Sequence, residues 1–151
     1  MALINNKQTR GVGFQGAGDQ LISLVPGWNE VSAENLEIFK KATKDLKLVK
    51  AGLIEYGLTR AEKKDGKDVT VYLDFADLTE EQAEAIIDGP GGSEDNPNRS
   101  NGGTNDPRLL DKWKSQEERP AVRLALTKRI EYIKDYKAQN DLDSDRDLDE
   151  D

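Results

Sequence analysis

The residues that most invite a chemical interpretation are alternating aspartates near the C-terminal end of the chain. They are Asp141, Asp143, Asp145, Asp147 and Asp149. Carboxylate oxygens are the ligands that Ca²⁺ prefers, but an EF-hand loop needs Gly at its sixth position. Counted from Asp141, that position is Arg146. We therefore predict a solvated acidic segment and no specific metal site.

Two further patterns resemble cofactor or catalytic sites. Gly11, Gly13 and Gly16 have the spacing of a dinucleotide-binding turn. That turn needs a buried strand before it and a helix after it, whereas here polar residues precede and a strand-like run follows. The adjacent carboxylates at 80–81 and 117–118 would point about 100° apart on a helix, so neither pair predicts an acid–base couple.

The chain contains no cysteine and no histidine. Disulfides, thiolate nucleophiles and cysteine-ligated zinc are therefore excluded, and the commonest general base and metal ligand are missing. Carboxylate and lysine chemistry remain open. We predict a protein that is not an enzyme, with no catalytic residue, no cofactor and no bound metal.

Large aromatic and basic side chains are the remaining candidates for a functional surface, because such residues often anchor interfaces. The candidate partner-binding residues are Trp28, Tyr72, Trp113, Arg119, Arg123 and Arg129. Trp28 either contacts a partner or covers the end of the next helix, and Tyr72 either contacts a partner or packs on its sheet surface. The other four could form a phosphate-binding patch with an aromatic residue; the alternative, which we favour, is that the three arginines belong to a solvated helix face.

Charge is distributed unevenly along the chain, whose formal net charge is -8. Residues 107–140 carry an excess of Lys and Arg, while residues 1–106 and 141–151 carry an excess of Asp and Glu. A basic segment of this kind is a candidate for binding an acidic partner. The alternative, which we favour, is that the acidic tail screens the neighbouring basic helix.

The periodic segments predict an α+β fold whose first part is a small N-terminal binding module at residues 1–88. Its opening residues are polar and rich in glycine, so we expect a flexible lead-in with one short strand near 12–14. Residues 20–25 are short, apolar and partly β-branched, which is typical of a strand. Pro26–Gly27 then supplies a turn.

A helix, a hairpin and a second helix should complete this module. Ser32 is a good N-cap, and apolar residues recur at intervals of three and four up to Gly52, where the helix should stop. Alternating residues on both sides of Asp65–Gly66 predict a hairpin whose second strand, 69–75, has one buried face. The capping-box pattern at 79–82 predicts a further short helix.

The second half of the chain is predicted as a linker, a helical pair and a tail. Residues 89–106 hold no large apolar side chain, which is typical of a flexible linker. Pro107 starts a helical pair at 107–138, and residues 139–151 form a disordered acidic tail. A pair of this size buries too little surface to be stable alone. It should therefore dock on the first module, self-associate or bind a partner.

The sequence predicts neither a membrane-spanning segment nor a secretion signal. No apolar run approaches the roughly 18 residues needed to cross a bilayer, and the N-terminal residues lack a charged segment followed by an apolar one. We expect a protein that does not enter membranes and that works in a cytoplasm-like compartment.

Residues 21–56 and 109–130 carry two patterns that occur together in one group of proteins. The first combines a short strand, Leu-x-Pro-Gly-x-Asn-x-Val and a helix with an aromatic anchor. Its matching residues are Leu24, Pro26, Gly27, Asn29, Val31 and Phe39. The second contains Leu-Leu, then Glu-x-Arg, then Val-Arg-x-Ala-Leu and Arg-Ile. In these features the chain resembles small accessory proteins from the structural-gene modules of tailed phages and Mu-like prophages.

The resemblance implies a non-enzymatic structural or assembly protein that binds the phage capsid or head–tail connector components. Such a protein would be found in the virion, and in the host cytoplasm during assembly. The alternative is a nucleic-acid-associated phage regulator that uses the basic helical pair, with the acidic tail as an intramolecular competitor. A third hypothesis is an acidic decoy that occupies a host nucleic-acid-binding site.

Overall fold

The structure of the protein is a computed structural model. It describes the backbone of residues 1–94 and 103–149 and the side chains of residues 1–94 and 103–135. Small sheets and helices both contribute to it, so the predicted α+β class is confirmed. The sheet regions occupy the N-terminal half, and the longer helices follow them in the chain.

A three-stranded sheet lies in the middle of the body. Its strands are β4 (Gly27–Val31), β1 (Ala2–Asn6) and β5 (Ile54–Tyr56), in that order, and both pairings are antiparallel. Every residue of β1 is buried. The prediction of a flexible lead-in is therefore wrong for these residues, because later strands pair with both edges of β1 and satisfy its backbone groups.

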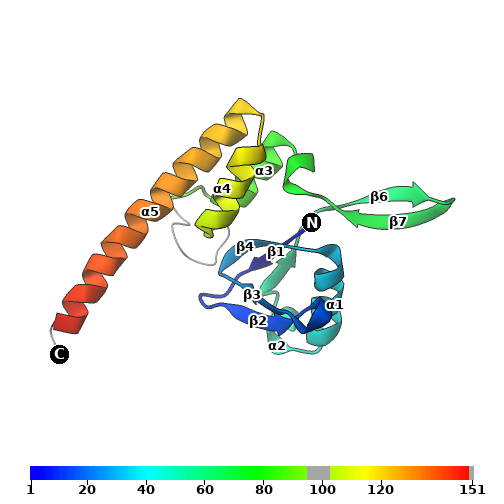
Figure 1. The fold of residues 1–151 in the computed structure, drawn as a ribbon, viewed down its shortest axis with the longest axis horizontal. Helices are drawn as coiled ribbons and strands as arrows, with labels where there is room; N and C mark the ends of the chain where they lie inside the picture. The colour runs from blue at the N-terminus through cyan, green and yellow to red at the C-terminus, as the bar shows by residue number, and fades with distance from the viewer. Residues whose placement is uncertain (95–102, 150–151) are drawn as a thin grey trace.

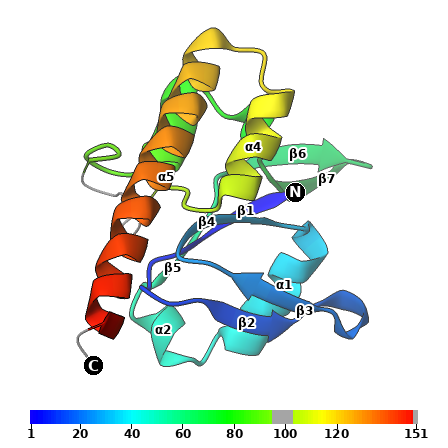
Figure 2. The same ribbon diagram turned by 60° about the vertical axis from the view of Figure 1, so that its left-hand side comes forward.

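One face of this sheet is covered by the N-terminal half of the chain. Ala2 and Ile4 of β1 join a hydrophobic cluster with residues of helix α1 (Ala33–Thr43) and of a hairpin. The hairpin consists of β2 (Val12–Gln15) and β3 (Leu21–Leu24), and β3 confirms the strand predicted at this place. Figure 2 shows this hairpin and α1 on the side away from the longer helices.

The other face of the sheet is covered by helices α3 (Glu80–Asp88), α4 (Pro107–Gln116) and α5 (Pro120–Asp149) (Figures 1 and 2). Side chains alternate between the two faces along a strand. Leu3 of β1 therefore points to these helices, and it forms one hydrophobic cluster with Trp28 of β4 and residues of all three helices. The predicted N-terminal module and helical pair thus share a core.

The helix predicted for residues 32–52 is two helices in the structure. It begins as predicted, since the Ser32 hydroxyl accepts a backbone N–H of the first turn. However, α1 ends at Thr43, and a short helix, α2 (Lys47–Lys50), follows it. The Thr43 hydroxyl donates to the Phe39 carbonyl at 2.6 Å, a local bond that competes with a regular helix.

A second hairpin projects from the body (Figure 1), and we call it the arm. It consists of β6 (Thr59–Lys64) and β7 (Lys67–Tyr72). Asp65 and Gly66 both have positive φ, 55° and 76°, as the predicted two-residue turn requires. The prediction that one face of the hairpin is buried is wrong. No residue of either strand is buried, and the arm does not join the three-stranded sheet.

The short helix after the arm has the capping box that was predicted. The Thr79 hydroxyl accepts the Gln82 backbone N–H at 3.1 Å, and the Gln82 side chain accepts the Thr79 N–H at 3.0 Å. Gly89 ends α3 with a φ of 75°. Phe75 and Leu78, just before this helix, are buried in the shared core, so they connect the base of the arm to the helices.

The end of the predicted linker, 89–106, is packed and not flexible. Thr104 is fully buried, and its backbone N–H and hydroxyl donate to two carbonyls near the C-terminal end of α3. The Gly103 carbonyl accepts the Trp28 N–H at 2.9 Å, which ties this segment to β4 as well. The middle of the predicted linker, 95–102, lies outside the described residues.

The helical pair is present, and its second helix is longer than predicted. The Asp106 side chain caps α4, and Pro107 occupies the first turn. The helix predicted to stop near 138 continues through most of the segment predicted as a disordered tail, to the end of α5. Extending a formed helix requires fixing fewer backbone angles than starting one, which favours continuation. Figure 1 shows α5 reaching beyond the other elements.

Candidate functional site

An open cleft of about 710 Å³ lies between the three-stranded sheet and α3, and we call it the cleft. Its lining residues are Asn5, Lys7, Trp28, Glu55, Tyr56, Leu58, Gln82, Ala85, Ile86 and Pro90. Asn5 is paired across the sheet with Trp28 on one side and with Glu55 on the other. These three residues share the helix-facing side of the sheet. The cleft is therefore the part of that face that the helices leave open.

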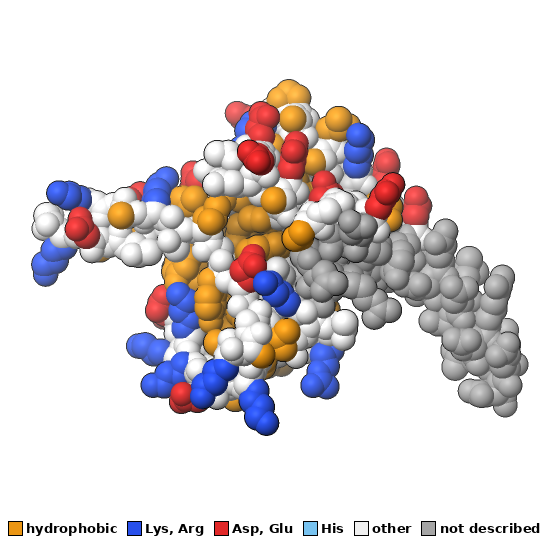
Figure 3. Space-filling model, turned by 180° about the vertical axis from the view of Figure 1, so that it is seen from behind, with side chains coloured by type: hydrophobic (Ala, Val, Ile, Leu, Met, Phe, Trp, Pro, Cys, Tyr) orange, Lys and Arg blue, Asp and Glu red, His pale blue; other side chains and the backbone are white. Residues whose placement is uncertain are grey.

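The walls of the cleft are mainly apolar. Gln82, Ala85 and Ile86 lie on one side of α3, because residues three and four apart share a helix face. Tyr56 and the exposed Leu58 come from β5 and the chain just after it, where the arm begins. Figure 3 shows hydrophobic side chains gathered between the helices and the N-terminal sheet, near the base of the arm.

A few polar groups lie on the sheet side of the cleft. The Lys7 ammonium forms an ion pair of 3.1 Å with the Glu55 carboxylate, and both side chains are exposed. Asn5 is buried, and its Oδ1 has no hydrogen-bond donor among the described residues. A mostly apolar concave surface with few polar groups is typical of a binding site. The described residues include no group of three carboxylates that could hold a metal ion.

The base of the arm is fixed to α1 by a small polar cluster. The Lys40 ammonium lies 4.6 Å from the centroid of the Tyr56 ring and 4.9 Å from that of Tyr72. Burial disfavours the charge on Lys40, but the hydrogen bond with Tyr72 and the charge of Glu37 outweigh it, so the pKa of Lys40 is raised. The Tyr72 hydroxyl donates to the Glu37 carboxylate at 3.2 Å. The candidate Tyr72 therefore makes intramolecular contacts.

Both candidate tryptophans are buried. Trp113 stacks on Phe75 with ring centroids 4.1 Å apart, and its indole N–H donates to the Glu30 carboxylate at 3.0 Å. Trp28 is 6% exposed, and it belongs to the shared core while its edge lines the cleft. It does not cover the start of α1, because Trp28 and α1 lie on opposite faces of the sheet. Of the six candidates, Trp28 is the one that lines the cleft.

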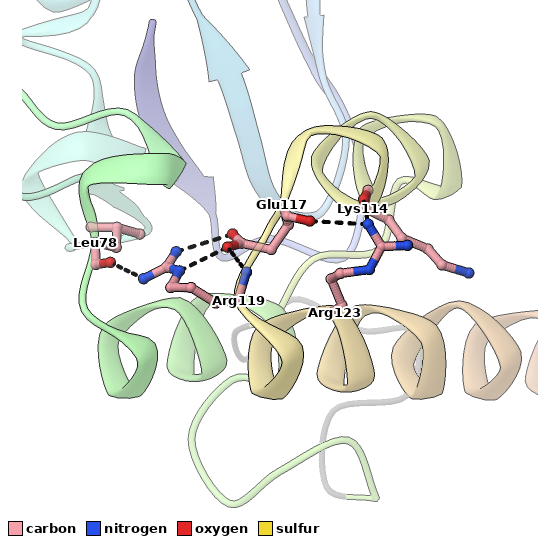
Figure 4. Close-up of polar contacts among 5 residues, drawn as sticks. All are labelled: Leu78, Lys114, Glu117, Arg119 and Arg123. Carbon is pink, nitrogen blue, oxygen red and sulfur yellow. Dashed lines mark hydrogen bonds and ion pairs between the residues drawn. The ribbon is translucent and has the colours of Figure 1, made fainter.

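Arg119 and Arg123 hold together the corner between α4 and α5 (Figure 4). The Arg119 guanidinium donates to both oxygens of Glu117, at 2.7 and 3.0 Å, and to the Leu78 carbonyl. The hydrogen bond from Arg119 lowers the pKa of Glu117. Arg123 donates to the carbonyls of Lys114 and Glu117, at 3.1 and 3.0 Å, where α4 ends. Both guanidinium groups therefore satisfy internal acceptors.

Arg129 is fully buried, which corrects the prediction that it lies on a solvated helix face. It donates to the Thr104 carbonyl at 3.0 Å and to the Asn105 side chain at 2.6 Å. Burial lowers the pKa of Arg129, and the nearby Asp88 carboxylate acts in the opposite direction. Arg129 is buried because the segment before α4 supplies these hydrogen-bond acceptors. The spacing of apolar residues along the helix gives no sign of them.

The predicted nucleic-acid patch is not assembled by these residues. Trp113 is in the core, and the three arginines of the set donate to internal oxygens. The functional surface that the sequence interpretation missed is the cleft. Its sheet side depends on β1, which was not predicted, so neighbours such as Asn5 and Glu55 could not be placed together. The one local signal was Leu58, an apolar residue between a strand and an exposed hairpin.

Comparison of the chain with protein-family models, curated proteins and solved structures found no match. Among the described helices, none combines the length and the apolar character needed to cross a membrane.

Proposed function

We propose that this protein acts by binding another protein, without catalysis, as a structural or assembly component of a tailed-phage particle. The observation that carries the proposal is the cleft, an open and mainly apolar surface beside a projecting arm. In this proposal an apolar side chain of a capsid or head–tail junction protein inserts between Trp28, Leu58 and Ala85. The Lys7–Glu55 pair then borders the contact.

The shape of the surface supports a protein partner. A volume of about 710 Å³ also suits a small molecule, but the cleft is open, and its lining extends to Leu58, at the base of the arm. Stable protein interfaces bury about 800 Å² on each partner. A partner that fills the cleft and contacts the base of the arm would meet an apolar centre with a charged rim.

The phage setting is supported by the two stretches that resemble accessory proteins of tailed phages. In the first stretch, the Asn29 side chain accepts the Val25 N–H at 3.0 Å and donates to the Val25 and Gly27 carbonyls at 2.8 and 3.0 Å. The motif thus builds the turn before β4. The second stretch, 109–130, forms most of α4 and the start of α5. The virion, and the host cytoplasm during assembly, are the locations that this setting implies.

Quantitative mass spectrometry of purified phage particles tests the proposal. We expect the protein at a fixed ratio to the major capsid protein. Ala85→Glu, which places a charge in the cleft, should lower that ratio about tenfold or more, since an unpaired charge in an interface is costly. Ala42→Glu, on the exposed side of α1, is the matched control and should leave it unchanged.

Two results would contradict the proposal in different ways. Absence of the wild-type protein from particles, together with its presence in infected cells, would contradict the virion setting. Incorporation of Ala85→Glu at the wild-type ratio would contradict the role of the cleft. The nucleic-acid alternative gains no support from the described residues, because the arginines it requires make internal hydrogen bonds.

A further inference from the structure

The arm has two free strand edges. It is a two-stranded sheet, and no further strand among the described residues pairs with β6 or β7. Isolated two-stranded hairpins are marginally stable in water. A free edge also presents unpaired N–H and C=O groups that can bond to another strand. The arm projects from the body, so its edges are accessible to a second chain (Figure 1).

The hydrogen bonds at the base of the arm identify which backbone groups are free. The Leu73 N–H donates to the Leu58 carbonyl at 2.9 Å, just beyond the Thr59–Tyr72 pair. In an antiparallel ladder, bonded pairs alternate with non-bonded pairs. The N–H and C=O groups of 67, 69 and 71 in β7 therefore bond to β6. Those of residues 68, 70 and 72 point to the outer edge.

We propose that the β7 strands of two copies of this protein pair antiparallel, in a register centred on Thr70. The two arms then form a four-stranded sheet in the order β6–β7–β7–β6, related by a twofold axis. Thr70 lies opposite Thr70 of the second copy, and Asp68 lies opposite Tyr72. In this register the outward N–H and C=O groups of one strand meet those of the other.

The side chains of β7 suit a second copy in this register. Val69 of each copy lies opposite Val71 of the other, in the non-hydrogen-bonded position where side chains approach more closely. Both valines are only partly buried in one copy, so the pairing removes apolar surface from water. No residues of like charge oppose each other between 68 and 72. The twofold pairing also uses the β7 edge of both copies, so it closes as a dimer.

The outer edge of β6 is less suited to pairing. All six of its residues are exposed, and its sequence, Thr-Arg-Ala-Glu-Lys-Lys, contains no large apolar side chain. Lysines on an edge strand discourage strand addition. Pairing through β6 would therefore join exposed charged side chains, which contribute little free energy. This contrast between two edges of one hairpin is the basis of the experiment.

Cross-linking at a single cysteine tests the register, because the chain contains no cysteine of its own. In a hydrogen-bonded antiparallel pair the Cα atoms are about 5.5 Å apart, within the range of a disulfide. We expect mild oxidation to convert Thr70→Cys mainly to a disulfide-linked dimer. Ala61→Cys is the matched control, since Ala61 faces Thr70 across the arm and lies on the outer edge of β6. It should cross-link about tenfold less.

Sedimentation of uncross-linked full-length protein over a concentration series gives a second, independent test. Thr70→Pro removes an outward N–H without removing a bond within the arm, and Ala61→Pro does the same on β6. We expect dimers for the wild type and for Ala61→Pro. For Thr70→Pro the dissociation constant should rise about a hundredfold, the effect of losing the two central hydrogen bonds.

Three outcomes would overturn the proposal. They are a monomeric wild type at every concentration, equal cross-linking of the two cysteine variants, and open-ended polymers that Ala61→Pro abolishes. The last would assign the contact to the pairing of β6 of one copy with β7 of the next, because only two different edges give an open-ended assembly. Circular dichroism of the two proline variants checks that each keeps the body fold. The result does not depend on the cleft, so it is separable from the particle experiment.

Discussion

The α4–α5 corner and the arm are both rich in basic residues, but they use them in different ways. At the corner, Arg119 and Arg123 donate to oxygens of the same chain. On the arm, Arg60 pairs with Glu62 two residues away, and the lysines of β6 are exposed. A basic side chain stabilises the fold where it donates to the unpaired carbonyls at a helix end. On an isolated hairpin it remains exposed and available for other contacts. A basic stretch of sequence therefore does not by itself predict a binding surface.

The comparison predicts that substitutions in and around the corner destabilise the fold, whereas matched substitutions on the arm do not. The largest effect is expected for Trp113→Ala. It removes the stack on Phe75 and the bond to Glu30, and it leaves a cavity in the shared core. We expect the free energy of unfolding in urea to fall by about 3–5 kcal/mol. Val71→Ala on the arm is the control, with a change below about 1 kcal/mol. Equal losses would show that the arm is part of the cooperative fold.

Arg129→Met should have the next largest effect. It keeps much of the side-chain volume, but it removes the donors to the Thr104 carbonyl and the Asn105 side chain. Losing hydrogen bonds from a buried charged group should cost about 2–3 kcal/mol in unfolding free energy. Arg60→Met on the arm is matched in chemistry and should change it by less than about 0.5 kcal/mol. A neutral Arg129→Met would mean that the 103–106 segment is held by other contacts.

Glu117, at the corner, should make the stability of the fold depend on pH. Its folded-state pKa is lowered by the Arg119 hydrogen bond, so its contribution to stability is present above the ordinary pKa of 4.5. That contribution is lost as the pH falls through the folded-state value. We expect Glu117→Gln to lower the unfolding free energy by about 1 kcal/mol at pH 7. The difference from the wild type should disappear in strong acid. Glu62→Gln, in the exposed pair on the arm, should change the unfolding free energy at pH 7 by less than about 0.5 kcal/mol.

The smallest effect is expected at the contact between the arm and α1. Lys40→Met removes the ammonium group that lies over Tyr56 and Tyr72. The unfolding free energy should change by less than about 0.5–1 kcal/mol, as for other partly exposed cation–π contacts. Amide hydrogen exchange in β6 and β7 should nevertheless become faster. Lys41→Met, on the exposed side of α1, should leave the exchange rates unchanged.

The parts of the fold that follow from local chemistry were predictable. The Ser32 cap, the Thr79 capping box and the Asp65–Gly66 turn each depend on hydrogen bonds or backbone angles within a few residues. The class of the fold followed from them. The central strand was not predictable in the same way, because Ala2–Asn6 has no clear alternation and is defined by strands that come later in the chain.

The candidate site illustrates the same limit. The cleft joins residues from β1, β4, β5 and α3, and no short segment contains more than a few of them. The six candidate residues were predicted from their type alone, as large aromatic or basic side chains. Their roles were decided by distant partners, such as Phe75 for Trp113 and Thr104 for Arg129. Residue type alone therefore predicted which side chains are important, and not what they do.

The position of β1 has a consequence for how the chain acquires its fold during synthesis. Its strand partners lie at 27–31 and 54–56, and the helices that pack on Leu3 include residues beyond 107. Strand β1 therefore leaves the ribosome before all of these partners and is among the last to be completely enclosed. Such non-local contacts slow folding and leave apolar surface open to wrong association in the meantime. A chain cut short before α4 would keep the sheet and α3 but expose the apolar surface that α4 and α5 cover, and we expect such a fragment to aggregate.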